Sequence, residues 1–286
     1  MTDEPFFLRR PLRRDSPVVF ASPHSGRDYP AAFRRASPLD DAALRSSEDA
    51  FVDALFGAAP DLGAPLLAAR APRAYLDLNR APDELDPALI EGVQRSPHNP
   101  RVSSGLGVVP RVVANGRAIY AGRLPLAEAE ARIARIWHPY HAALRGLIEE
   151  SVALFGEAVL IDCHSMPHEA IEAHARPGSP RPEVVLGDRF GAAAGRDVVE
   201  RVEASFAAAG LRVTRNAPFA GAYIAQAYGR PSRRQHVVQV EIDRALYMDE
   251  TRIAPRPDFE AFRAMMTGVV ARIIADSRGQ GALAAE

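Results

Sequence analysis

Hydrophobic residues along the chain fall into short continuous runs separated by longer segments of helical periodicity. The clearest runs cover residues 18–22, 66–69, 158–162 and 237–242. Their length predicts strands, and the valine and isoleucine content of all but residues 66–69 indicates that these strands are buried. Strands that alternate with helical segments in this way predict an α/β fold built around one sheet.

Four segments place apolar residues on one side of a helix: residues 40–62, 125–155, 191–209 and 258–278. Within 125–155 the stripe is formed by Ile133, Ile136, Tyr140, Leu144, Leu147 and Ile148. We expect the first helix to be interrupted near Ser46. Residues 74–78 are predicted to be extended, and the polar, proline-containing segments 81–107 and 166–182 to be long loops.

Length and composition narrow the class of protein. A chain of 286 residues can form one large α/β domain or two small ones. We predict a single domain over residues 1–286, with 1–16 as an N-terminal extension and 279–286 as a frayed tail. The net charge of −1 argues against a nucleic-acid partner. No apolar segment approaches the roughly 18 residues of a membrane span.

The expected compartment is the cytoplasm. Cys163 is the single cysteine, so an intrachain disulfide is impossible. The first 15 residues are acidic and then arginine-rich, and they lack the apolar stretch of a signal peptide.

Three polar clusters follow the predicted strands and carry candidate chemistry. They are residues 23–26 (PHSG), 162–165 (DCHS) and 241–244 (EIDR). Ligands bind at the carboxyl ends of the strands in such sheets, so His24 and His164 can converge on one metal ion. Two histidines, one carboxylate and an open fourth position are typical of a catalytic zinc site. Glu48 and Asp49 on the following helix are the nearest acidic candidates.

Other readings of these clusters remain open. A single histidine after a strand is more often a loop or capping residue than a ligand. Ser25 and Ser165 are possible nucleophiles, although neither lies in a G-x-S-x-G elbow. Cys163 can be read as a thiol nucleophile, but strand alternation points it away from Asp162 and His164, which favours a place in the core.

Residues 77–80 (DLNR) offer a site for an anionic substrate group. If the extended segment ends here, Asn79 and Arg80 project into a cleft. Arg80 can then hold a carboxylate through two parallel hydrogen bonds. The alternative is a surface salt bridge.

Taken in order, these segments resemble the N-formylglutamate amidohydrolase family. The resemblance rests on residues 22–30 (SPHSGRDYP), 77–80, 106–111 (LGVVPR), 137–141 (WHPYH), 162–167 (DCHSMP) and 241–248 (EIDRALYM), and it covers about residues 17–250. It implies an α/β fold with a mixed central sheet and helices on both faces, of the phosphorylase/hydrolase-like type found in zinc carboxypeptidases and aspartoacylases. It also implies one zinc ion per chain, although cobalt, manganese or iron would suit the same ligands.

The resemblance implies a role for each candidate residue. His24, His164 and Asp49, favoured over Glu48, are metal ligands, and Glu241 is the general base. Asn79 and Arg80 hold a substrate carboxylate. The further candidates for substrate binding are Tyr223, Arg111 and Arg73.

Two positions depart from the related sequences. Arg27 stands where the aspartoacylase-type His-x-x-Glu pair has its glutamate, so the metal carboxylate must come from elsewhere. Residues 221–225 read GAYIA in place of Gly-Gly-Tyr-Ile-Thr, which leaves the acyl group open.

The implied reaction is the hydrolysis of N-formyl-L-glutamate, a small acidic substrate, to formate and L-glutamate. The metal activates a water molecule and Glu241 takes its proton. The alternatives are a deacylase or peptidase of the same metal-hydrolase class, an inactive protein that binds acidic ligands, and a serine or cysteine hydrolase whose activity survives chelation. The oligomeric state stays open.

Overall fold

The computed structural model describes residues 4–94, 99–113, 116–172 and 181–278. The main sheet of these residues has seven strands in the order β1-β3-β2-β4-β7-β5-β6. Their bounds are β1 (Phe6–Arg9), β2 (Val18–Ser22), β3 (Leu66–Ala69), β4 (Ala158–Met166), β5 (Val184–Gly187), β6 (Val213–Arg215) and β7 (Gln235–Asp243). A separate pair is formed by β8 (Met248–Asp249) and β9 (Ala254–Pro255).

The main sheet is mixed. The pairs β2–β4, β4–β7 and β5–β6 are parallel, whereas β5 runs antiparallel to β7. The helices are α1 (Ala31–Ala36), α2 (Asp41–Arg45), α3 (Val52–Leu55), α4 (Pro100–Ser103), α5 (Leu126–Arg132), α6 (His138–Phe155), α7 (His168–Glu172), α8 (Arg196–Ala207), α9 (Tyr223–Tyr228) and α10 (Phe259–Arg278). Short helical turns are η1 (Pro60–Leu62), η4 (Pro231–Arg233) and η5 (Arg244–Leu246), and η3 (Ile133–Trp137) is a π-helix. No helix of the described residues has both the length and the apolar character needed to cross a membrane.

The chain divides into two compact units built from interleaved segments. Unit 1 comprises Met1–Phe7, Pro23–Ala50 and Ala68–Ala143, and unit 2 comprises Leu8–Ser22, Phe51–Leu67 and Leu144–Glu286. The single domain over 1–286 stays a prediction. The predicted N-terminal extension contains strand β1, and the predicted tail 279–286 lies outside the described residues.

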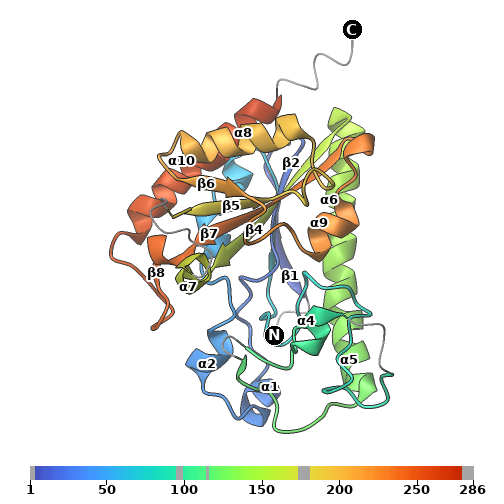
Figure 1. Cartoon of the computed structure of the whole chain (residues 1–286). Coiled ribbons are helices and arrows are strands. Elements are labelled where there is room, and N and C mark those ends of the chain that lie inside the picture. The colour runs from blue at the N-terminus through green and yellow to red at the C-terminus, as the bar shows by residue number, and fades with distance from the viewer. Residues whose placement is uncertain (1–3, 95–98, 114–115, 173–180, 279–286) are drawn as a thin grey trace. The chain divides into compact units, whose positions relative to one another are not determined.

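Unit 2 contains most of the sheet and the larger core. Every residue of β2, β4 and β5 is buried, as continuous apolar runs predict for strands covered on both faces. Helices α8 and α10 lie on one side of these strands, and α9 and the C-terminal part of α6 lie on the other (Figure 1). The predicted α/β class, with a mixed sheet and helices on both faces, is confirmed.

Unit 1 is richer in loops and turns. Its described residues include an aromatic cluster of Phe33, Tyr75 and Tyr120, with Arg132 stacked on the Tyr75 ring at 3.9 Å. The predicted extended segment 74–78 is wrong. The amides of Tyr75 and Leu76 both donate to Pro72 O, so the chain turns there.

The predicted helix over 40–62 is three short pieces, α2, α3 and η1, and the predicted interruption near Ser46 is confirmed. The helices at 125–155 and 258–278 are confirmed, the first with a π-helical turn in its middle. The strand predicted to end at Asp162 continues to Met166, so His164 lies within it. Strand β5 was not predicted.

Candidate active site

The loop after β2 presents His24 and is held against residues 70–71. Gly26 is required there, because a Cβ at this position would lie 2.1 Å from Ala71 O. The Asp28 amide donates to Arg70 O at 2.9 Å. The sequence around His24 therefore fixes the path of the loop and the place of the imidazole.

Each nitrogen of the His24 ring faces a carboxylate. Nδ1 lies 3.3 Å from Asp49 Oδ2, and Nε2 lies 2.7 Å from Asp77 Oδ1. All three side chains are buried. The Asp49 amide also donates to His24 O at 3.0 Å, so the loop and the turn after α2 are joined next to this group.

Glu48, the alternative candidate for the metal ligand, contacts Tyr29 and Arg45. Its carboxylate accepts a hydrogen bond of 2.6 Å from Tyr29 Oη and bonds of 3.2 Å from Arg45 Nε. Burial raises the pKa of Glu48, and the bonds from Arg45 and Tyr29 offset this only in part. The geometry therefore brings Asp49, and not Glu48, to the His24 ring.

Asp77 lies at the centre of a buried hydrogen-bond network. The sequence patterns did not identify it as a site residue. Besides His24, its carboxylate accepts from Arg73 Nε at 3.0 Å and from the Asn79 amide at 2.8 Å. Burial alone would raise the pKa of Asp77, but Arg73, His24 and Arg80 together hold it well below its usual value. Asp77 is therefore an anion that both orients His24 and shapes the turn that carries Asn79.

Arg80 is buried, with 6% of its surface exposed. Burial lowers the pKa of its guanidinium, but an arginine stays charged. Its Nε is buried and makes no hydrogen bond to the described residues, and the nearest Asp77 oxygen lies 3.9 Å away. Arg80 is therefore not part of a surface salt bridge, which was the alternative interpretation of the sequence.

The other candidate residues lie on one face of β4 and β7. These parallel strands pair Asp162 with Gln239 and His164 with Glu241. Paired positions of neighbouring strands point to the same face and lie about 4.8 Å apart. Gln239 Nε2 donates to Glu241 Oε1 at 2.8 Å, and His164 Nε2 lies 3.0 Å from Asp162 Oδ1.

Gln239 is a second residue that sequence reasoning missed. Its signal was available, because it interrupts an apolar run two positions before Glu241. Cys163 points to the opposite face, is fully buried, and has a thiol pKa raised well above its usual value by burial. That environment disfavours the thiolate, so the structure supports its predicted place in the core.

The two remaining substrate-binding candidates differ in their surroundings. Tyr223 begins helix α9, directly after Ala222, whose amide donates to Gln239 Oε1 at 2.9 Å. Arg111 Nε donates to the buried Asp86 at 2.8 Å. Arg111 thus already holds a carboxylate of the chain.

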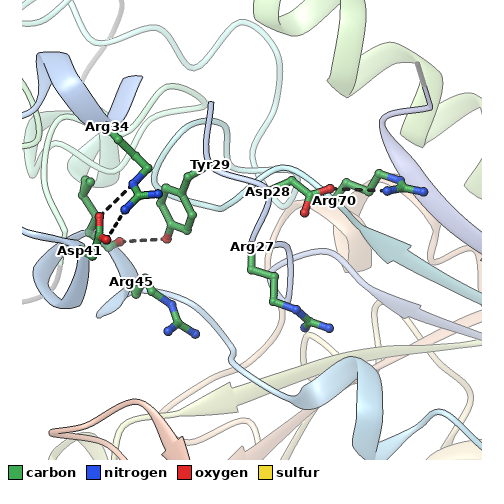
Figure 2. Close-up of a pocket in the computed structure, with 8 residues that line it drawn as sticks. Arg27, Asp28, Tyr29, Arg34, Asp41, Arg45 and Arg70 are labelled. Atoms are coloured by element: carbon green, nitrogen blue, oxygen red, sulfur yellow. Dashed lines mark hydrogen bonds and ion pairs between the residues drawn. The ribbon is translucent and has the colours of Figure 1, made fainter. Parts of the chain in front are cut away.

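A pocket of about 740 Å³ opens in unit 1 on the same two segments that carry His24 and Asp49. Arginines dominate its lining, and Figure 2 shows Arg34 paired with Asp41 on one side and Arg70 paired with Asp28 on the other. These guanidinium groups are already bound to carboxylates of the chain. The pocket is therefore a less suitable anion site than the buried Arg80.

Among the described residues, His24, Asp49 and His164 form a buried group of side chains that can hold a metal ion. One imidazole nitrogen from each histidine and one carboxylate oxygen supply three donors. Two nitrogen donors and one oxygen donor suit a borderline cation such as zinc. Magnesium and calcium prefer sites in which all the ligand atoms are oxygen.

Comparison with known proteins identifies the relatives of the chain. Residues 16–248 match the family model of N-formylglutamate amidohydrolase. An N-formylglutamate deformylase of Pseudomonas aeruginosa is 32% identical over 92% of this chain and 94% of its own length. The enzyme of the same name from Pseudomonas putida is 31% identical, over 82% of this chain and 83% of its own length.

Solved structures agree with these matches. A crystal structure of N-formylglutamate amidohydrolase from Ralstonia eutropha is 37% identical, with a TM-score of 0.89 over 96% of this chain and 98% of that one. A gene product from Agrobacterium tumefaciens, 16% identical, shares the fold with a TM-score of 0.64 over 96% of each chain. The chain belongs to the N-formylglutamate amidohydrolase family.

Proposed function

We propose that this chain is a zinc-dependent amidohydrolase that converts N-formyl-L-glutamate to formate and L-glutamate. The reaction is the one named for its Pseudomonas relatives and its Ralstonia structural neighbour. The observation that carries the proposal is the buried group of His24, Asp49 and His164.

The surroundings of His24 support a metal at this group. In tetrahedral coordination with bonds of about 2.0 Å, two ligand atoms lie roughly 3.3 Å apart. His24 Nδ1 and Asp49 Oδ2 have that separation, at 3.3 Å. The other ring nitrogen of His24 faces Asp77 at 2.7 Å, and metal-binding histidines commonly donate their second N–H to a carboxylate in this way.

A divalent metal held by these three residues would polarise the formyl carbonyl and lower the pKa of the attacking water. We propose zinc, while cobalt, manganese and iron accept the same donor types. We also propose the cytoplasm as the compartment, because a single cysteine suits a reducing environment.

Glu241 is the proposed general base. It stands beside His164 in the register of β4 and β7, and Gln239 fixes its Oε1 with a bond of 2.8 Å. Glu241 takes a proton from the water molecule while the oxygen of that water bonds to the formyl carbon. It then gives the proton to the nitrogen of glutamate as the C–N bond breaks, which releases formate and the free amine.

Arg80 and Asn79 are proposed to hold a carboxylate of the substrate. The support is the burial of Arg80 and the Nε that makes no hydrogen bond to the described residues. Tyr223 and Arg111 are further candidates for the second carboxylate. Arg111 already donates to the buried Asp86, whereas Tyr223 begins helix α9 directly after Ala222, whose amide donates to Gln239.

A panel of acylated amino acids tests the proposal. Metal-loaded protein should hydrolyse N-formyl-L-glutamate with a kcat/KM ~10- to 200-fold above that of N-acetyl-L-glutamate, because one extra methyl in a fitted pocket costs about that factor. N-succinyl-L-glutamate and N-formyl-L-aspartate complete the panel. Faster turnover of the acetyl or succinyl compound would identify a different deacylase, and binding of glutamate without any turnover would identify a binding protein.

A further inference from the structure

The backbone of the segment that carries Asn79 and Arg80 is held by hydrogen bonds that are not part of any helix or strand ladder. Residues 77–80 form no helix or strand, although all four are buried. Backbone groups in such a place must find partners elsewhere. The Asp77 amide donates to Val108 O at 2.8 Å, and the Asn79 amide donates to the Asp77 carboxylate.

The carbonyl groups on both sides of Asn79 are bonded by one helical region. His141 Nε2 lies 2.9 Å from Leu78 O, and Trp137 Nε1 donates to Arg80 O at 2.9 Å. The Trp137 and His141 rings stack, with centroids 3.9 Å apart and an angle of 28° between their planes. Both side chains are buried, so the bonds are shielded from water.

The π-helical turn η3 explains how a third donor, Arg132, reaches the turn at residues 72–76 that precedes this segment. Arg132 Nη1 donates to Tyr75 O at 3.1 Å, and Arg132 stacks on the Tyr75 ring. Arg132 and Trp137 are five positions apart, which would place them about 140° apart around a regular α-helix. The wider π-turn over Ile133–Trp137 brings both to one side.

We propose that Trp137 and His141 are positioning residues that fix the backbone on each side of Asn79 and thereby aim Arg80 at the substrate carboxylate. This inference rests on the proposed function. It gives a role to the WHPYH segment, residues 137–141, which the catalytic scheme does not use. Trp137 and His141 act through Asn79 and Arg80 and need not touch the substrate.

The test uses Trp137→Phe and His141→Phe, which keep an aromatic ring and remove the N–H donor. Each should lower kcat/KM for N-formyl-L-glutamate by ~10- to 100-fold, mainly through KM, because a misplacement of about 1 Å can cost that much. The matched control is Glu149→Gln, since Glu149 lies on helix α6 outside this segment and is exposed. The control should keep wild-type kinetics.

Two readouts separate positioning from a general loss of structure. N-formylglutamine and N-formylisoglutamine each lack one of the two carboxylates of N-formyl-L-glutamate. The loss in kcat/KM should be small for the analogue that lacks the carboxylate held by Arg80. In an Arg80→Lys background, His141→Phe should add little further loss, because coupled residues are not additive. Equal losses on all substrates, or full additivity with Arg80→Lys, would overturn the proposal.

Hydrogen–deuterium exchange provides a readout that does not depend on turnover. Exchange in residues 76–81 should increase in Trp137→Phe and His141→Phe and stay unchanged in Glu149→Gln. His141→Gln, which keeps an N–H donor, should restore protection even if His141→Phe folds poorly. Unchanged exchange in the folded variants would refute the positioning role, whereas a wild type that hydrolyses no formylated substrate would refute the proposed function instead.

Discussion

Burial distinguishes Arg80 from the many arginines on the surface of the chain. Arg34 and Arg70 hold nearby aspartates in partly open surroundings, whereas Arg80 is enclosed and its Nε makes no hydrogen bond to the described residues. A buried cation is costly unless an anion reaches it. Asp77 supplies part of that balance at 3.9 Å, and a substrate carboxylate can supply the remainder.

The substitution Arg80→Lys keeps the charge and removes the planar fork. We expect kcat/KM for N-formyl-L-glutamate to fall ~10- to 1000-fold, roughly 1.4–4 kcal/mol of transition-state stabilisation. Arg34→Lys is the matched control, because Arg34 is exposed and paired with Asp41. Steady-state measurements of kcat and KM for the two variants test this expectation. Wild-type values in Arg80→Lys would show that Arg80 does not bind the substrate.

At the scale of elements, the alignment of β4 with β7 determines which polar groups meet. Asp162, His164, Gln239 and Glu241 occupy alternate positions of two paired strands, so all four share one face. Apolar residues fill the other face, with Cys163 and Val240 among them. The polar face therefore sits in the middle of the sheet without disturbing the packing behind it.

This register makes Glu241→Gln a sharp test of the base. The amide keeps the shape and hydrogen bonding of the side chain but cannot take a proton. We expect kcat to fall ~10²- to 10⁴-fold while zinc content and melting temperature stay near wild type. Glu200→Gln, an exposed position on α8 paired with Arg196, should change none of these.

Two other outcomes of Glu241→Gln would redraw the site. Normal turnover would mean that Glu241 is not the base. Loss of zinc would make Glu241 a metal ligand.

Sequence patterns predicted strands β2, β3, β4 and β7 and the long helices α6, α8 and α10, because continuous apolar runs and helical stripes reflect burial directly. Strands β1 and β5 were not predicted. The patterns failed where polar residues occupy buried positions. Strand β4 runs to Met166, but its apolar run stops at Ile161, since Asp162 and His164 replace hydrophobic residues at the candidate site. The turn at 72–76 was missed because its hydrogen bonds end on Pro72 O, which no periodicity reveals.

At the scale of the whole molecule, the candidate residues come from distant parts of the chain: residues 24, 49, 79–80, 164 and 241. Spacing along the sequence says little about which of them meet. The histidines could be proposed as ligands because each follows an apolar run. Glu48 and Asp49 were the nearest acidic candidates, and only the family resemblance favoured Asp49 over Glu48. The contacts of Asp77, Gln239, Trp137 and His141 required the structure, because each depends on a partner from another segment.

Metal reconstitution tests the central claim most directly. Protein stripped of metal with a chelator should not hydrolyse N-formyl-L-glutamate, and added zinc should restore the rate in proportion until about one equivalent per chain is bound. His24→Ala and His164→Ala should fail to bind the equivalent and stay inactive. A metal-free protein that turns over at the full rate, or full zinc binding by both alanine variants, would contradict the account.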